Sequence, residues 1–196
     1  ERFFEHSGID VRALLRVFKG LVSGDLKGGG STITQQLAKL LFPRKRLNKF
    51  EFALRKFKEW IIASKLEKNY TKEEILSMYL NKFDFLNNAV GINSAAQVYF
   101  NKIPKELELH ESAMLIGMAK NPSLFNPIRR PDTVLKRRTV VLYQMYKNKY
   151  ITKEVFDSTK KLELDLDYNK VDHQTGLAPY FREILRLELG KIFSEK

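Results

Sequence analysis

The chain has 196 residues, of which 43% are hydrophobic and 30% are charged, and it contains no cysteine. This length and composition are typical of one folded domain, and the lack of cysteine excludes disulfide bonds and thiol catalysis. The formal net charge is +12, which indicates either a solvated basic face or an anionic partner: nucleic acid, an anionic membrane surface or a phosphate-bearing substrate.

The residue pattern also disfavours two classes of protein, those with a membrane-spanning helix in this segment and those with a histidine-based zinc site. No run approaches the ~18 apolar residues that a membrane-spanning helix needs. Three scattered histidines argue against a histidine-based zinc site. The first residue is not methionine, and we expect the chain to be part of a longer protein.

Apolar residues recur with helical spacing through most of the chain, which predicts a mostly α fold without internal repeats. Asp10 and Gly24 mark the ends of the first helix, and Pro43 stops the second. The expected helices cover, in chain order, residues 11–23, 33–42, 50–69, 72–81, 91–100, 110–120, 131 to at least 145, 152–161 and 179–193.

Two stretches carry more specific expectations. The helix over 50–69 is expected to bury an apolar side formed by Leu54, Phe57, Ile61 and Leu66. Residues 162–176 lose the helical pattern and briefly alternate leucine with acidic residues, so they could form an edge strand or a linker.

Three glycines, Gly28 to Gly30, lead into the polar string Ser31-Thr32-Ile33-Thr34-Gln35-Gln36. Thr32 with Gln35 three residues later resembles a capping box, so a helix should begin near Ile33. Free N–H groups and the helix dipole make such a start a site for anions. Taken alone, however, the string is also typical of an ordinary surface loop.

The basic excess is concentrated between Lys39 and Lys68, where ten Lys or Arg stand against three Glu. On the predicted helix, Glu51, Arg55 and Glu59 share one face. This pattern indicates either a surface ladder of ion pairs or a carboxylate held among cations to organise an anionic substrate.

Five segments together resemble the signature motifs of the peptidoglycan glycosyltransferases (glycosyltransferase family 51), the bacterial cell-wall polymerases. The resemblance covers residues 1 to about 160. Its segments are Phe3, His6 and Gly8 as the tail of E-D-x-x-F-x-x-H-x-G, then Gly29–Gln36, Arg55–Glu59 as R-K-x-x-E, Lys72–Asn81 as K-x-x-I-L-x-x-Y-L-N, and Arg137–Leu142 as R-R-x-x-V-L.

The resemblance implies a fold, a reaction and a cellular place. The fold is a lysozyme-like helical large lobe with a smaller mobile lobe over the cleft. The reaction polymerises lipid II into glycan strands, inverts MurNAc C1 and releases undecaprenyl pyrophosphate. No cofactor is required by it, although a divalent cation such as Mg²⁺ or Mn²⁺ is compatible with it. Expected partners are lipid II, the lipid-linked glycan chain, a membrane surface and other cell-wall synthesis proteins, with no nucleic acid.

The parent is expected to be a class A penicillin-binding protein, with a monofunctional glycosyltransferase as the alternative. Residues 1–170 would form the glycosyltransferase domain, and 171–196 would begin a linker toward a transpeptidase domain. The domain would lie on the outer, periplasmic side of the cytoplasmic membrane, anchored by a transmembrane helix outside this chain.

The family's principal catalytic glutamate falls before Glu1, and we expect Glu-Asp immediately upstream. Within the chain, Glu59 matches the family's second acid, with a role left open between orienting Lys56 and contacting the acceptor. Arg44 could replace Arg46 in the site because the loop from Pro43 to Phe50 is a few residues longer than the spacing usual in the family. The residues implied to bind substrate are Ser31, Thr34, Gln35, Gln36, Lys39, Arg46, Arg55, Lys56 and Lys120.

Other motif positions are interpreted as scaffold, namely His6, Tyr79, Asn81, Asn126 and Arg138. Two alternative functions remain at this point. A lysozyme-like hydrolase would need two acids that flank a glycosidic bond, and it would not explain the cations around Lys39 and Arg55. A basic helical nucleic-acid binder would use the charge of the chain but would leave the Gly-Ser-Thr-Gln string unexplained.

Overall fold

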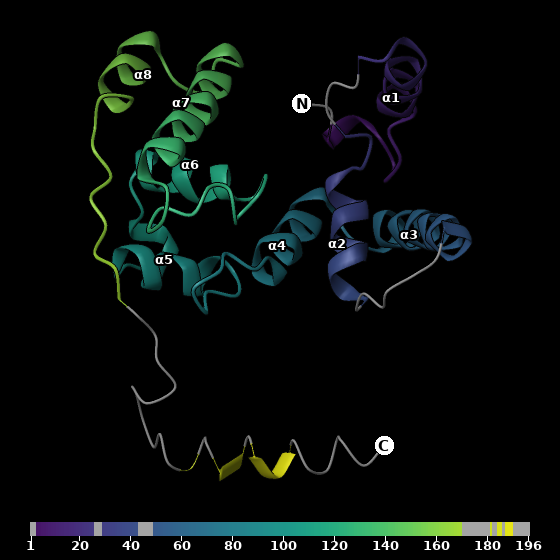
Figure 1. Cartoon of the computed structure of the whole chain (residues 1–196). Helices are drawn as coiled ribbons and strands as arrows, with labels where there is room; N and C mark the ends of the chain where they lie inside the picture. Colours follow the sequence, from purple (N-terminus) through teal and green to yellow (C-terminus); the bar gives the residue numbers. More distant parts are fainter. Residues whose placement is uncertain are drawn as a thin grey trace. The chain divides into compact units, whose positions relative to one another are not determined.

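The computed structural model describes residues 3–25, 29–42 and 49–169, together with 181, 184, 185 and 187–189 (Figure 1). Over these residues the chain is helical, and its one pairing of extended backbone is an isolated bridge between Asp84 and Val90. The elements are η1 (Phe3–Glu5), α1 (Val11–Ser23), α2 (Ile33–Leu41), α3 (Lys49–Asn69), α4 (Lys72–Lys82), α5 (Ile92–Phe100), η2 (Pro104–Glu106), α6 (Leu109–Met118), α7 (Pro131–Lys147) and α8 (Lys153–Thr159). The predicted mostly α class is confirmed.

Helix ends follow the capping residues that the sequence predicts. Asp10 accepts a hydrogen bond from the Ala13 amide at 3.1 Å, and Gly24 closes α1 in the left-handed conformation. Thr71 and Glu74 form a complete capping box at the start of α4. The observed bounds therefore differ from the expected ones by one or two residues, which is the usual scatter at helix ends.

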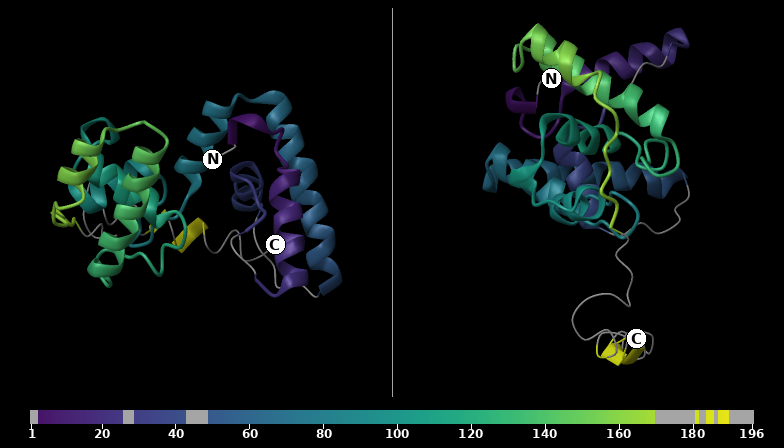
Figure 2. Two further views of the ribbon diagram at one scale, coloured as in Figure 1. Left: turned by 90° about the horizontal axis from the view of Figure 1, so that it is seen from above. Right: turned by 90° about the vertical axis from the view of Figure 1, so that its left-hand side faces the viewer.

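The chain divides into two compact units, residues 1–84 with 90–92 and residues 85–89 with 93–196. In the first unit, α2 packs against both α3 and α4. The buried side chains at this junction include Leu37, Ala38, Ala63, Ile75 and Tyr79. Figure 2 shows the helices of this unit from two further directions.

The expected inward side of α3 is wrong for three of its four residues, and the fourth, Leu66, is half-buried. Leu54, Phe57 and Ile61 are 47%, 59% and 57% exposed. The buried face of α3 instead carries Glu59 and Ala63, one turn apart. The charged partners of Glu59 lie on the same helix, so this carboxylate can be buried without an unpaired charge. An apolar-residue pattern alone could not identify that face.

In the second unit, α7 packs against α6 and α8. Tyr99, Met114, Leu115, Val134 and Leu142 are among its fully buried side chains. Residues 162–169 form no strand. They are tied down by a hydrogen bond from the Asn169 amide to the Val98 carbonyl at 2.9 Å, so the described part of 162–176 is an anchored extended segment.

The helix expected over 179–193 falls largely outside the described residues; those described between 181 and 189 are helical. Among the described residues, none of the helices combines the length and apolar character needed to cross a membrane.

Candidate active site

The polar string ends in the helix start that the sequence predicts. Thr32 is the N-cap of α2, and its hydroxyl accepts from the Gln35 amide at 3.2 Å. The same hydroxyl donates to the Gly8 carbonyl at 2.7 Å. The Gln35 side chain also donates to that carbonyl, at 3.1 Å. The first turn of α2 is thereby bound to the chain segment that precedes α1.

Two of the residues predicted to bind substrate lie in the interior of the first unit. Gln35 is 1% exposed and holds Gly8. Thr34 is fully buried, and its hydroxyl donates to Glu67 Oε1 at 2.5 Å. In this structure both side chains bind protein groups, and a direct contact with substrate stays a prediction.

The other predicted residues of this string are more accessible. Ser31 is exposed, and Gln36 and Lys39 are half-buried one turn apart on α2. The amide oxygen of Gln36 accepts from the Tyr79 hydroxyl at 3.3 Å. Burial raises the pKa of the Tyr79 phenol, which keeps it protonated and able to donate. Ser31, Gln36 and Lys39 are therefore the side chains of this helix start that can reach a ligand.

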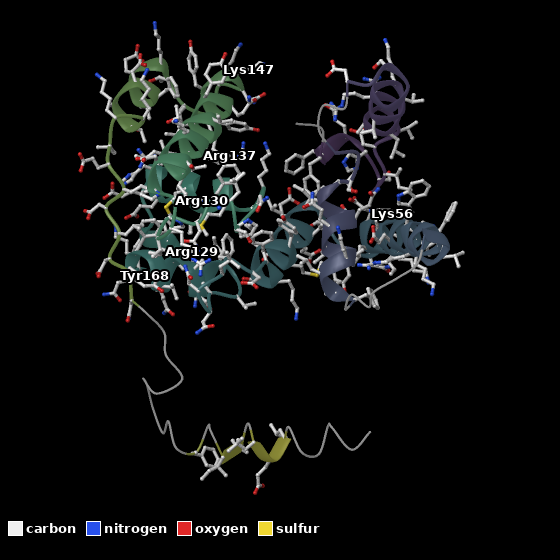
Figure 3. The ribbon with its side chains drawn as sticks, in the orientation of Figure 1. Lys56, Arg129, Arg130, Arg137, Lys147 and Tyr168 are labelled. Carbon is white, nitrogen blue, oxygen red and sulfur yellow. The ribbon has the colours of Figure 1, made fainter. Side chains whose placement is uncertain are left out.

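A cluster of charge lies on α3, where Figure 3 labels Lys56. Glu59 is 5% exposed. Its Oε2 lies 2.7 Å from Lys56 Nζ, and its Oε1 lies 3.4 Å from Arg55 Nε. The side chains of Arg55 and Lys56 are 22% and 30% exposed, whereas the Glu59 side chain between them is only 7% exposed. Burial of the acid favours the second interpretation of this motif, a carboxylate held among cations, over a solvated surface ladder.

Charges of this kind suit an anionic ligand. One carboxylate neutralises one of the two cations, so the cluster of Arg55, Lys56 and Glu59 keeps a net positive charge. A fixed and partly desolvated cluster interacts more strongly with a phosphate group than mobile surface lysines do. Guanidinium and ammonium groups are both common phosphate binders.

The scaffold interpretation holds for most of the remaining motif positions. The Nδ1 of His6 accepts from the Gly8 amide at 3.2 Å. Tyr79 and Asn126 are buried, and the Asn126 side chain accepts from the amides of Ile128 and Arg129. Asn81 differs, because it is exposed and its side chain bonds Ser77 within the same helix.

Arg138 is the most buried of these scaffold residues, at 0% exposure. It donates to the carbonyls of Leu162 and Glu163, and burial lowers the pKa of its guanidinium. Figure 3 labels the neighbouring Arg137 on α7; its Nε donates to the Gly117 carbonyl at 3.3 Å.

Three predicted residues are not joined to this site by the structure. Arg46 and its alternative Arg44 lie outside the described residues. Lys120 is exposed just after α6, in the second unit. Among the residues that the structure describes, no group of three His, Asp or Glu side chains could hold a metal ion, and the cofactor expectation stays a prediction.

Sequence reasoning missed two charged residues next to the string, Glu67 and Lys72, which form an ion pair at 2.7 Å. Lys72 was visible as the first residue of a motif, but the pattern gave no partner for it. Glu67 lies eight residues after Glu59 on the same face of α3, which is the signal that could have identified it.

Residues 1–146 match the family model described as Transglycosylase. The chain is 40% identical over 195 residues to penicillin-binding protein 1A of Escherichia coli (strain K12), covering 99% of this chain and 22% of that protein. It is 38% identical to penicillin-binding protein 1A of Neisseria lactamica, covering 100% and 24%. The chain thus spans about a quarter of the length of these relatives.

A solved structure is similar as well. The crystal structure of penicillin-binding protein 1A from Haemophilus influenzae matches with a TM-score of 0.51 and 36% identity, covering 65% of this chain and 18% of that chain. The likeness confirms the resemblance stated from the five motifs.

Proposed function

The chain belongs to the Transglycosylase family, and on that premise we propose that it polymerises lipid II into peptidoglycan glycan strands. The observation that carries the proposal is the buried Glu59 with Arg55 and Lys56 on its two oxygens. This cluster provides the cations that a departing pyrophosphate requires, because negative charge develops on the leaving group in the transition state.

In the proposed reaction, residues of this chain bind the leaving group and the sugars. Lys39, Arg55 and Lys56 hold the pyrophosphate of the growing strand, with Arg46 or Arg44 as a further cation. Ser31 and Gln36 contact sugar or phosphate oxygens. The GlcNAc 4-hydroxyl of the acceptor attacks MurNAc C1, its proton passes to a general base, and the C1–O bond to undecaprenyl pyrophosphate breaks with inversion.

The general base in this proposal is the glutamate of the Glu-Asp pair expected immediately upstream of Glu1. Glu59 supports the reaction from within the chain by keeping Lys56 in place. The complete protein would act at the outer face of the cytoplasmic membrane, where its lipid-linked substrates lie. A metal ion is not assigned a role in any of these steps.

A product assay tests this function in the complete protein. Incubation with lipid II is expected to give glycan chains that lengthen with time, whereas a hydrolase would shorten preformed strands. Lys39→Ala should lower the rate at least 10-fold, by removal of a charge-assisted contact to the leaving group. Lys105→Ala is the control, because Lys105 is an exposed cation of η2 in the other unit. A wild-type protein that shortens strands or leaves lipid II unchanged would refute the proposal.

A further inference from the structure

Lys72, at the start of α4, binds the segment that precedes α1. Its Nζ donates to the His6 carbonyl at 2.5 Å and lies 4.6 Å from the centre of the Phe3 ring. One ammonium group therefore holds this segment through a hydrogen bond and a cation–π contact. Neither contact is between neighbours in the sequence, so neither forms unless the first unit is folded.

The position of Lys72 is itself fixed by Glu67. The Oε2 of Glu67 lies 2.7 Å from Lys72 Nζ, and the side chains of both residues are mostly buried. Its other oxygen, Oε1, accepts from the Thr34 hydroxyl at 2.5 Å. A single carboxylate of α3 thus joins the first turn of α2 to the ammonium group that holds His6.

The segment is held at its other end by α2 and α3. Thr32 and Gln35 both donate to the Gly8 carbonyl. Gly8 has φ +87°, and a Cβ placed there would lie 3.0 Å from the Ala63 carbonyl oxygen. The backbone from Phe3 to Gly8 is therefore fixed by contacts to three helices.

We propose that Lys72 and Glu67 are positioning residues, which fix the Phe3–Gly8 segment against the start of α2 and thereby place the general base relative to the binding side chains of α2. This inference rests on the proposed function, because the base of that reaction is the glutamate expected two residues before Glu1, four positions upstream of Phe3. Charge-assisted hydrogen bonds are about twice as strong as neutral ones. The ion pair of Lys72 and Glu67 can therefore hold the segment through only a few contacts.

A positioning role predicts a specific kinetic effect. Neither Lys72 nor Glu67 is proposed to touch substrate, so their loss should leave substrate binding intact and misplace the base. A misplacement of about 1 Å can cost roughly 100-fold in rate. We therefore expect kcat to fall about 10- to 100-fold while KM changes by less than about 3-fold.

The experiment compares variants of the complete protein in lipid II polymerisation and in amide hydrogen exchange. Lys72→Met removes the charge, Lys72→Arg can still donate to both oxygen acceptors, and Glu67→Gln keeps an acceptor for Thr34. Lys82→Met is the matched control, because Lys82 is an exposed lysine in the last turn of the same helix. Exchange is followed in peptides that cover residues 3–8.

We expect faster exchange and lower kcat in Lys72→Met, recovery to within about 3-fold of the wild-type kcat in Lys72→Arg, and wild-type values in Lys82→Met. Glu67→Gln provides the test if Lys72→Met does not fold, and it should also lower kcat. Unchanged exchange at residues 3–8, or faster exchange with unchanged kcat, would overturn the positioning role. A wild-type protein that does not polymerise lipid II would refute the proposed function instead, and the exchange comparison would still decide whether Lys72 anchors the segment.

Discussion

Lys56 Nζ and Glu59 Oε2 lie 2.7 Å apart across one turn of α3, with the carboxylate buried and the lysine partly exposed. A buried acid beside an accessible cation is a poor source of stability, because desolvation of the acid offsets much of the attraction. The arrangement is better suited to fixing the direction of the lysine.

Glu59→Gln should lower kcat/KM for lipid II polymerisation by about 10-fold or more, because Lys56 and Arg55 lose the charge that orients them. The fold should survive, since glutamine has nearly the same shape. Activity of the complete protein on lipid II is the measurement. Glu73→Gln, at an exposed position on α4, is the control and should keep wild-type activity.

The same variant decides the role of Glu59. If the acid acts through Lys56, the effects of Glu59→Gln and Lys56→Met should not add, and the coupling should be about 0.5–3 kcal/mol. Additive losses would instead assign Glu59 an independent contact with the acceptor. Wild-type activity in Glu59→Gln would remove this acid from the mechanism.

The two adjacent glutamines of α2 should respond differently to substitution. Gln35 is buried and holds the Gly8 carbonyl, so Gln35→Ala should cost about 1–3 kcal/mol of stability. For a domain of this size the apparent Tm would fall by roughly 2–12 °C. Gln36→Ala should change stability less and should raise KM for lipid II.

Thermal unfolding and steady-state kinetics of both variants test this contrast. Loss of activity in Gln35→Ala with an unchanged Tm would contradict it, because that result would place Gln35 in direct contact with substrate. An unchanged KM in Gln36→Ala would remove Gln36 from the substrate-binding residues.

Local signals in the sequence were sufficient for the helices and for the family. Asp10, Thr32 and Thr71 are read correctly as N-caps, because a cap depends on residues only two or three positions away. Motif spacing likewise identifies Arg55, Lys56 and Glu59 as one group, since i, i+3 and i, i+4 residues meet on any helix.

Tertiary contacts could not be predicted from local sequence signals. The buried face of α3 contains a charged residue, Glu59, whereas Phe57 and Ile61 lie on the exposed side, so hydrophobic periodicity selected the wrong side. Which of Gln35 and Gln36 points inward depends on the Gly8 carbonyl, 27 residues from Gln35 along the chain. The sequence pattern contains no information about that partner.

Arg138 should be important for the stability of the second unit. Its guanidinium donates to the carbonyls of Leu162 and Glu163, and its removal leaves both acceptors without this donor. We expect Arg138→Met to cost about 2–4 kcal/mol, which corresponds to a fall in apparent Tm of roughly 4–16 °C. Lys136→Met, at an exposed position on the same helix, should change Tm by less than about 2 °C.

Limited proteolysis provides a second measurement for Arg138→Met. Cleavage within residues 160–169 should become faster, because this extended segment loses its hydrogen bonds to α7. Stability and proteolysis equal to those of the control would contradict the anchoring role of Arg138.

Gly91 combines two constraints that can be separated by experiment. Its φ is +86°, and a Cβ added there would lie 2.8 Å from the Asn81 carbonyl oxygen at the end of α4. Gly24 has φ +72° with no described atom within 4 Å of an added Cβ. Gly24→Ala should therefore cost only the left-handed backbone term, about 1–2 kcal/mol. Gly91→Ala should cost that amount and, in addition, the displacement of the Asn81 carbonyl.

Thermal unfolding of the two variants beside Gly29→Ala measures the steric part. Gly29 has neither a positive φ nor a described atom near an added Cβ. The Tm of Gly29→Ala should therefore differ least from that of the wild-type protein. Gly91→Ala should lower Tm more than Gly24→Ala by an amount equivalent to about 1–3 kcal/mol. Equal losses at Gly91 and Gly24 would mean that α4 and the turn after it shift without cost, and that the contact between Gly91 and Asn81 does not constrain this end of the helix.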